Sequence, residues 1–80
     1  MPVGSASSSN SAVRAHIAAN IRRLRVARHL SQEELGELAD CHRTYVSQLE
    51  RCKANISVDR LERLAQVLDV SVTDLMQPPT

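Results

Sequence analysis

Apolar side chains recur along this chain at the spacing of helices. Between residues 12 and 28 they stand three or four positions apart, at Val13, Ile17, Ile21 and Leu24, and this spacing places them on one face of a helix. Arginines lie around that face, so the segment is predicted to be an amphipathic helix with one buried side.

Two more helices are predicted nearer the C-terminus. After Ser57, one helix face carries the apolar residues Val58, Leu61, Leu64, Ala65 and Leu68. Ser71, followed three positions later by Asp74, is predicted to cap a short last helix that Pro78 stops.

Between these helices lies a segment with a more specific pattern. Residues 32–39 are predicted to form a short helix, because its inner face would carry Leu35, Leu38 and Ala39. Ser31 and Glu34 have the spacing of a capping box, in which each side chain binds the other residue's backbone N–H. This pair predicts where the helix begins.

A second helix is predicted over residues 43–51, with Val46 and Leu49 on its inner face. Gly36, inside the preceding helix, costs about 1 kcal/mol relative to alanine, which indicates that another backbone approaches too closely for a larger side chain. Asp40 lies between the helices, where the chain needs a left-handed residue, and Asp tolerates that conformation better than most. Two helices that cross through a short turn make a helix-turn-helix.

The N-terminal segment has no such periodicity. Residues 1–11 are small and rich in serine, so they are predicted to be a disordered tail. An arm that enters the minor groove of DNA is the alternative, but such arms need basic side chains and the first one is Arg14. The predicted organisation is this tail, one domain over residues 12–77, and a short C-terminal tail over residues 78–80.

Composition restricts the fold class. The chain has 80 residues, no Trp, no Phe and one Tyr, so its core must be aliphatic, and a chain of this length holds one small domain. With five predicted helices, an all-α fold is expected. The sequence contains no run of about 18 apolar residues and no signal-peptide pattern at its start, so a cytoplasmic location is expected.

The charges are distributed unevenly along the chain. The net charge is only +1, yet residues 14–28 contain five arginines and no acid, whereas residues 33–40 contain four acids and no base. The balance turns positive again over residues 43–53. A phosphate would therefore meet a stronger local field than the net charge indicates.

Cysteine and histidine positions argue against a disulfide, a metal site, a cofactor or an active site. A helix over residues 43–51 would separate Cys41 from Cys52 by roughly 13 Å, whereas a disulfide needs Cα atoms within about 7 Å. The histidines are scattered and lack the spacing of metal ligands. Ser47, Cys41 and the histidines form no nucleophile–base set, so we do not expect an enzyme.

The outer face of the second motif helix carries the candidate residues for reading DNA. In a helix-turn-helix, this helix enters the major groove with its N-terminal residues at the base edges. Arg can grip guanine through two hydrogen bonds, Gln can pair with adenine, and the Thr methyl can contact a thymine methyl. The candidates are His42, Arg43, Thr44, Ser47 and Gln48. The alternative is an ordinary solvated helix face.

Three segments of the chain resemble a known family. LSQEELGELA, RTYVSQLER and NISVDRLERLAQVLDVSVTDLM are similar to the landmarks of the Cro and phage-repressor-like regulators, also called XRE-type. RTYVSQLER looks particularly like the controller proteins of restriction–modification systems. The resemblance implies a compact five-helix, lambda-repressor-like domain that binds double-stranded DNA. In that family, the usual base readers occupy the positions of Arg43, Thr44, Ser47 and Gln48.

Contacts to DNA phosphates are expected at both ends of the motif. Gln32 begins the first motif helix, where backbone amides and the helix dipole favour an anion. The resemblance implies that Lys53 and Asn55, in the loop after the second motif helix, contact the same strand, and that many relatives carry a second base where Ala54 stands. Tyr45 has two interpretations: its ring packs beside the first motif helix, or its hydroxyl meets a phosphate.

The resemblance also indicates what to expect at two further positions. Glu50 is expected to pair with Arg25, which would tie the helix over residues 12–28 to the recognition helix. Cys52 stands where the family usually has glycine, at the end of the recognition helix. A left-handed conformation there suits glycine and costs cysteine about 1–2 kcal/mol.

The resemblance also implies a homodimer and a function. Val72, Leu75 and Met76 would pair two subunits, which would place two recognition helices about 34 Å apart over a palindromic operator. The alternative is that these residues fold back onto residues 12–28. The implied partners are operator DNA, a second copy of the chain and RNA polymerase, with no membrane. Transcriptional regulation of the restriction–modification controller type is therefore expected; an antitoxin or a protein-interaction adaptor is the alternative.

Overall fold

The computed structural model describes residues 3–79 and contains five helices in this range. They are α1 (Val3–Ala27), α2 (Gln32–Leu38), α3 (Arg43–Glu50), α4 (Val58–Val67) and α5 (Val72–Met76). Since no strand occurs among these described residues, the predicted all-α fold is confirmed. No helix in this part of the chain combines the length and the apolar character that crossing a membrane requires.

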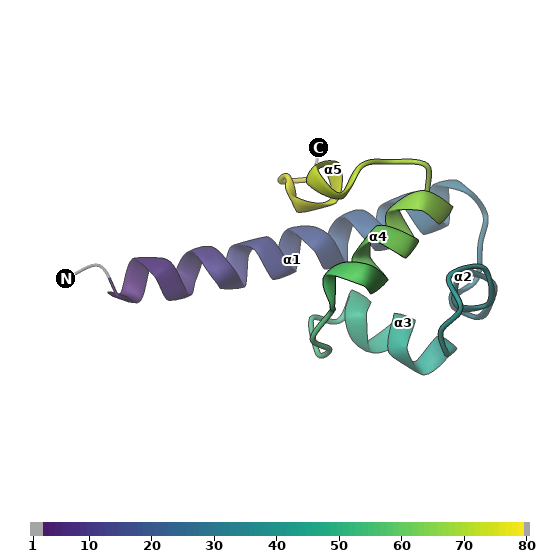
Figure 1. Ribbon diagram of the computed structural model, residues 1–80, viewed down its shortest axis with the longest axis horizontal. Helices are drawn as coiled ribbons and strands as arrows, with labels where there is room; N and C mark the ends of the chain where they lie inside the picture. Colours follow the sequence, from purple (N-terminus) through teal and green to yellow (C-terminus); the bar gives the residue numbers. More distant parts are fainter. Residues whose placement is uncertain (1–2, 80) are drawn as a thin grey trace.

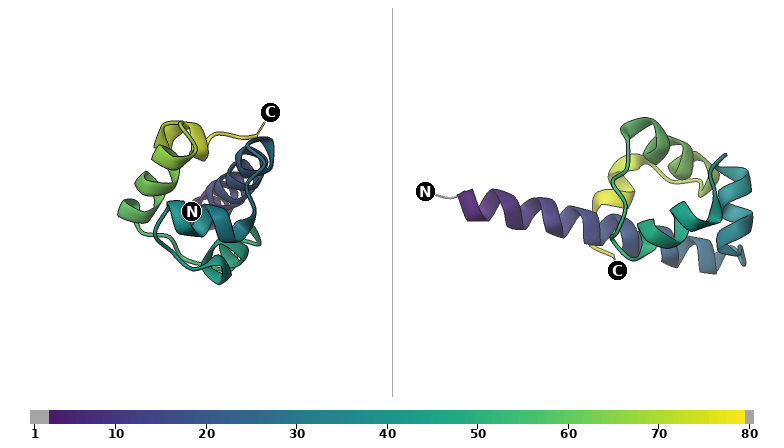
Figure 2. Two further views of the ribbon diagram at one scale, coloured as in Figure 1. Left: turned by 90° about the vertical axis from the view of Figure 1, so that its right-hand side faces the viewer. Right: turned by 90° about the horizontal axis from the view of Figure 1, so that it is seen from below.

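Helix α1 is the longest element, and the other helices are arranged around it. α2 to α5 gather around its C-terminal half, while its N-terminal part projects beyond them (Figures 1 and 2). The helices enclose an aliphatic core, whose largest fully buried apolar side chains are Ile21, Leu35, Leu64, Leu68, Leu75 and Val46. Burying a side chain of this size stabilises a fold by about 1.5–3 kcal/mol, so this core is the main source of stability.

The N-terminal segment continues the first helix. α1 begins at Val3, so the predicted helix start near residue 12 is wrong, whereas the division of the chain into a tail over residues 1–11 and a domain over residues 12–77 stays a prediction. Met1, Pro2 and Thr80 lie outside the described residues. Elongation of an existing helix is far easier than nucleation, and no proline or glycine occurs between Gly4 and Ala27 to stop it.

Each of the four later helices begins at a side chain that accepts a hydrogen bond from the first turn. The capping residues are Ser31, His42, Ser57 and Ser71. Ser31 and Ser71 form capping boxes with Glu34 and Asp74, as their spacing predicted. Such caps satisfy backbone N–H groups that a helix leaves free at its start.

The first four helices end in a common backbone motif. A left-handed residue follows each helix, namely His29, Asp40, Cys52 and Asp69, with φ between 58° and 60°. The next backbone N–H then returns to a carbonyl of the last turn, as from Lys53 to Gln48 at 2.7 Å. This arrangement is a Schellman motif, which normally uses glycine. The left-handed conformations expected at Asp40 and Cys52 are confirmed.

A buried asparagine holds α5 against α1. Asn20 is 2% exposed, and its Nδ2 donates to the carbonyl oxygens of Leu75 at 2.9 Å and Gln77 at 2.7 Å. These carbonyls lie at the end of α5, where a helix leaves its acceptors unpaired. Asn20 was not predicted from the sequence, although its spacing from Ile17 and Leu24 places it on the buried face of α1.

Two apolar residues that were assigned to inner faces are exposed instead. Leu38 is 52% exposed and Val58 is 71% exposed. Both lie at a helix end, where the neighbouring helices no longer cover the edge of the apolar stripe. In α2 the buried positions are Leu35 and Gly36, followed by Ala39 at the C-cap.

Candidate nucleic-acid interface

The two motif helices cross where the turn approaches α2 closely. A Cβ atom added at Gly36 would lie 2.6 Å from the carbonyl oxygen of Cys41, which is closer than these atoms can pack. The close backbone approach predicted at Gly36 is therefore confirmed. It allows α3 to lie across α2 with Asp40, at φ 59°, making the bend.

Helix α3 separates a buried face from an exposed one. Val46 and Leu49 are 0% and 3% exposed and pack into the core. Three candidate readers, Arg43, Thr44 and Gln48, are exposed, and Ser47 is half-buried. The exposed end of α3 is its N-terminal end, which is the end that a recognition helix presents to base edges.

His42 has a structural role at the start of α3. Its Nδ1 accepts a hydrogen bond from the backbone N–H of Thr44 at 3.1 Å, so it is the N-cap of the helix. In the neutral ring, Nε2 then carries the hydrogen. Because the side chain is exposed, this Nε2–H is available as a donor beside Arg43.

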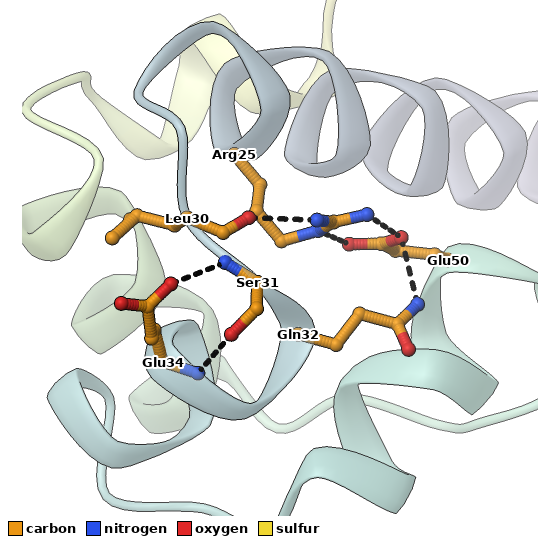
Figure 3. Close-up of polar contacts among 6 residues, drawn as sticks. All are labelled: Arg25, Leu30, Ser31, Gln32, Glu34 and Glu50. Atoms are coloured by element: carbon orange, nitrogen blue, oxygen red, sulfur yellow. Dashed lines mark hydrogen bonds and ion pairs between the residues drawn. The ribbon is translucent and has the colours of Figure 1, made fainter.

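A bidentate ion pair links α1 to α3 (Figure 3). Arg25 donates from Nε to Oε2 of Glu50 at 2.6 Å and from Nη2 to Oε1 at 3.0 Å, while its Nη1 donates to the carbonyl oxygen of Leu30 at 2.8 Å. The Arg25 and Glu50 side chains are 13% and 3% exposed. The hydrogen bonds that Arg25 donates to Glu50 raise the pKa of Arg25 above its ordinary value. The expected pair is confirmed.

Gln32 belongs to the same network (Figure 3). Its Nε2 donates to Oε1 of Glu50 at 3.2 Å, so one of its two amide hydrogens is used within the protein and the other remains for a phosphate. Beside it, the backbone N–H of Ser31 donates to Oε1 of Glu34 at 2.8 Å and lowers the pKa of the Glu34 carboxyl. Glu50 thus ties the start of α2 to the end of α3.

Tyr45 is directed toward the loop between α3 and α4. Its hydroxyl donates to the carbonyl oxygen of Asn55 at 3.2 Å, and the guanidinium of Arg60 lies 5.2 Å from its ring centroid. Burial raises the pKa of Tyr45. Because its only hydroxyl hydrogen is used in this bond, we leave Tyr45 out of the phosphate contacts proposed below. The side chains of Lys53 and Asn55 are exposed.

Arg60, which was not predicted from the sequence, joins α4 to the helix-turn-helix. Its Nη1 donates to the carbonyl oxygen of Asp40 at 3.0 Å, in addition to the contact with the Tyr45 ring. One side chain of α4 therefore supports both the turn and α3. A lone arginine on an amphipathic helix gives no sequence signal for such a role.

The predicted dimer residues differ in their exposure. Leu75 is 0% exposed within the single chain, so its assignment to a subunit interface is corrected: it belongs to the core, as the folding-back alternative predicted. Val72 is half-buried against that core. Met76 is 39% exposed. Asn20 fixes this orientation, because it binds the carbonyl oxygen of Leu75 and so seats α5 on α1.

The two cysteines do not form a disulfide with each other. Cys41 is half-buried and Cys52 is exposed, and both are free thiols. Within residues 3–79, no group of three or more His, Cys, Asp or Glu side chains is arranged to hold a metal ion.

Comparison with known proteins places this geometry in a family. A family model described as helix-turn-helix matches residues 21–75, which include all of α2 to α4. The chain belongs to the helix-turn-helix family. The family motif contains Gly36, Asp40 and the exposed face of α3, so the crossing described above is the helix-turn-helix itself.

Relatives of this helix-turn-helix chain include named regulators. A hypothetical transcription factor of Neisseria meningitidis serogroup B is 42% identical over 67 residues, which are 84% of this chain and 63% of that protein. This chain thus spans less than two thirds of the Neisseria factor. Control protein C.BamHI of Bacillus amyloliquefaciens is 39% identical over 57 residues, which are 70% of each protein.

Solved structures with the same helix-turn-helix fold agree with this assignment. The structure of the Neisseria factor superposes with a TM-score of 0.80 at 42% identity and covers 84% of this chain and 77% of that one. The restriction–modification controller protein C.AhdI of Aeromonas hydrophila gives a TM-score of 0.73 at 35% identity, over 78% of this chain and 94% of that one. The lambda-repressor-like fold expected from the sequence is confirmed.

Proposed function

We propose that this chain is a sequence-specific DNA-binding regulator of transcription that binds a palindromic operator as a homodimer. The controller proteins among its relatives favour a role in a restriction–modification system. In this role the protein acts in the cytoplasm without catalytic activity, and RNA polymerase is the protein whose access or recruitment the bound dimer changes.

One observation carries the proposal. The recognition helix α3 holds Val46 and Leu49 in the core and leaves Arg43 and Gln48 exposed at one side. Arg and Gln are the side chains with bidentate partners among base edges, guanine and adenine respectively. With Thr44 exposed beside them, α3 has the groups needed for direct readout in a major groove.

Phosphate contacts would position this reading helix. Gln32 begins α2, and Lys53 and Asn55 follow α3, so the candidate phosphate donors lie on both sides of the reader. The network of Arg25 and Glu50 supports this arrangement, because it ties the start of α2 to the end of α3. A phosphate bound at either position would thereby set the register of α3 on the duplex.

Dimerisation would place two such readers on one side of the DNA. Met76 is exposed and Val72 is half-buried on the surface of α5, and these two remain the proposed interface after Leu75 is assigned to the core. A palindromic site with half-site centres about 34 Å apart, one turn of DNA, would match the two-fold symmetry of the dimer.

Selection of bound duplexes from a random pool, followed by sequencing, tests the proposal. We expect an enriched inverted repeat whose half-site centres are about one helical turn apart. A single enriched half-site without symmetry would contradict the dimer alone. No enrichment, together with no binding to random DNA at low salt, would contradict DNA binding and favour the protein-interaction adaptor.

A further inference from the structure

An arginine of α1 lies beside the loop that follows the recognition helix. A notch of about 260 Å³ separates α1 from this loop. Its lining residues are Arg14, Ile17, Leu49, Cys52, Ala54, Asn55 and Ile56. Arg14 and Asn55 therefore line the same notch, although they are far apart in the sequence.

The backbone of Arg14 is held in place relative to the loop. The Sγ of Cys52, just after α3, makes a weak hydrogen bond to the carbonyl oxygen of Arg14 at 3.8 Å. One turn further along α1, Ile17 is 6% exposed and packs in the core with Leu49. The position of Arg14 beside the loop is thus fixed by the packing of α1 on α3.

The charge at this corner of the molecule is positive. Arg14 is the only charged residue among the described residues that line the notch, and its side chain is exposed. The loop between α3 and α4 has two cations, Arg51 and Lys53, and Ala54 follows them. Arg14 therefore adds a third cation beside this loop, on the side that faces α1.

We propose that Arg14 contacts a DNA phosphate on the strand that Lys53 and Asn55 bind. The contact comes from α1 and takes the place of the base that many similar proteins carry at the position of Ala54. It positions the protein without reading sequence. This inference rests on the proposed function, because it assigns a further residue to the same DNA-binding surface.

The same helix offers a matched control. Arg22 is also an exposed arginine of α1, but it lines a different, shallow surface together with Ala19, Val26 and Ala27. If the basic helix acted only through its total charge, Arg14 and Arg22 would be equivalent. If Arg14 binds a specific phosphate, replacing Arg14 will lower the number of counterions released on DNA binding, whereas replacing Arg22 will not.

The experiment measures binding of the full chain to the selected operator and to a random duplex by fluorescence anisotropy across a range of KCl concentrations. For Arg14→Ala we expect the slope of log K against log [KCl] to become shallower by about 0.9 for each phosphate that the variant no longer neutralises. Affinity should fall by the same factor on both duplexes. Arg14→Lys and Arg22→Ala should keep the wild-type slope, and adding Ala54→Lys to Arg14→Ala should restore it.

Different outcomes overturn the two proposals. Equal slopes for wild type, Arg14→Ala and Arg22→Ala would overturn the role of Arg14 while leaving operator binding intact. A weaker affinity confined to the operator would also overturn it, since that result indicates base reading. Absence of salt-dependent binding by the wild type would instead overturn the proposed function itself. Arg14 is exposed, so Arg14→Ala should retain the wild-type melting temperature, and thermal melts check this.

Discussion

Cys52 has a backbone conformation that does not suit its residue type. Its φ is 60°, in the left-handed region, and the same conformation occurs at His29, Asp40 and Asp69. Asp and His are several-fold enriched among non-glycine residues with positive φ, whereas a cysteine lacks the local hydrogen bonds that favour them. The Sγ of Cys52 makes only a weak contact, at 3.8 Å, with the carbonyl oxygen of Arg14.

Replacing Cys52 by glycine should therefore stabilise the protein. Glycine adopts positive φ without the steric cost of about 1–2 kcal/mol, and in a domain of this size 1 kcal/mol shifts the melting temperature by about 4–8 °C. Thermal melts of Cys52→Gly should show this rise. Cys52→Ala is the control, because alanine retains the strain and should give no gain. A lower melting temperature for Cys52→Gly would contradict the explanation.

Some of the left-handed residues could be predicted from the sequence and others could not. Asp40 and Cys52 were recognisable because they stand inside a motif whose helix ends are known. His29 and Asp69 adopt the same φ at the ends of α1 and α4. They were not predicted, because no glycine marks these ends and local residue preferences alone did not fix the last residue of either helix.

A single carboxylate connects the helices that carry the proposed DNA-reading surface. Glu50, at the end of α3, accepts hydrogen bonds from Arg25 of α1 and from Gln32 of α2. Arg25 also binds the carbonyl oxygen of Leu30 between α1 and α2. The relative orientation of three helices thus depends on one ion pair, whose Arg25 and Glu50 side chains are 13% and 3% exposed, and on the half-buried Gln32.

Removing this carboxylate should destabilise the fold strongly. Glu50→Ala leaves the buried guanidinium of Arg25 without its partner, which costs about 3–5 kcal/mol, and thermal or urea denaturation measures the decrease in stability. Glu33→Ala, which removes an exposed acid of α2, is the control and should be near neutral. The double variant Arg25→Met with Glu50→Leu should recover most of the stability, because it removes both charges. A neutral Glu50→Ala would contradict this role.

Periodicity predicted the helices better than it predicted their buried residues. The apolar spacing identified α4, but Val58 at its first position is exposed, and Leu38 at the end of α2 is exposed as well. Conversely, Asn20 lies on the apolar face of α1 and is buried. Its burial depends on the carbonyl oxygens at the end of α5, more than fifty residues away along the chain. The local sequence pattern therefore could not predict that Asn20 is buried.

Helix α1 organises the whole molecule. Arg25 ties it to the recognition helix and Asn20 ties it to α5, so the proposed reading face and the proposed dimer surface share one support. In a dimer, this connection would set the distance between the two copies of α3. Half-site spacing would then follow from the packing of α1, not from a flexible linker.

The candidate base readers could be proposed from the sequence because they lie close together along the chain. Arg43, Thr44, Ser47 and Gln48 lie within one turn and a half of α3, so the outward face could be identified by counting from Val46. The support that Arg60 gives to the turn and the role proposed for Arg14 were not predicted, because both residues come near the motif through the tertiary packing of α4 and α1. Leu75 was misassigned for the related reason that apolar character alone does not separate a core from an interface.

The central claim is that α3 reads bases, and Arg43 tests it most directly. We expect Arg43→Ala to weaken binding to the selected operator by about 1–3 kcal/mol, to relax specificity at one base pair, and to leave binding to a random duplex nearly unchanged. Arg63→Ala, which removes an exposed arginine of α4, is the matched control and should have little effect on either duplex. Fluorescence anisotropy on both duplexes at one salt concentration measures the difference. An equal decrease in affinity for the operator and for random DNA, or no decrease for either, would contradict the claim.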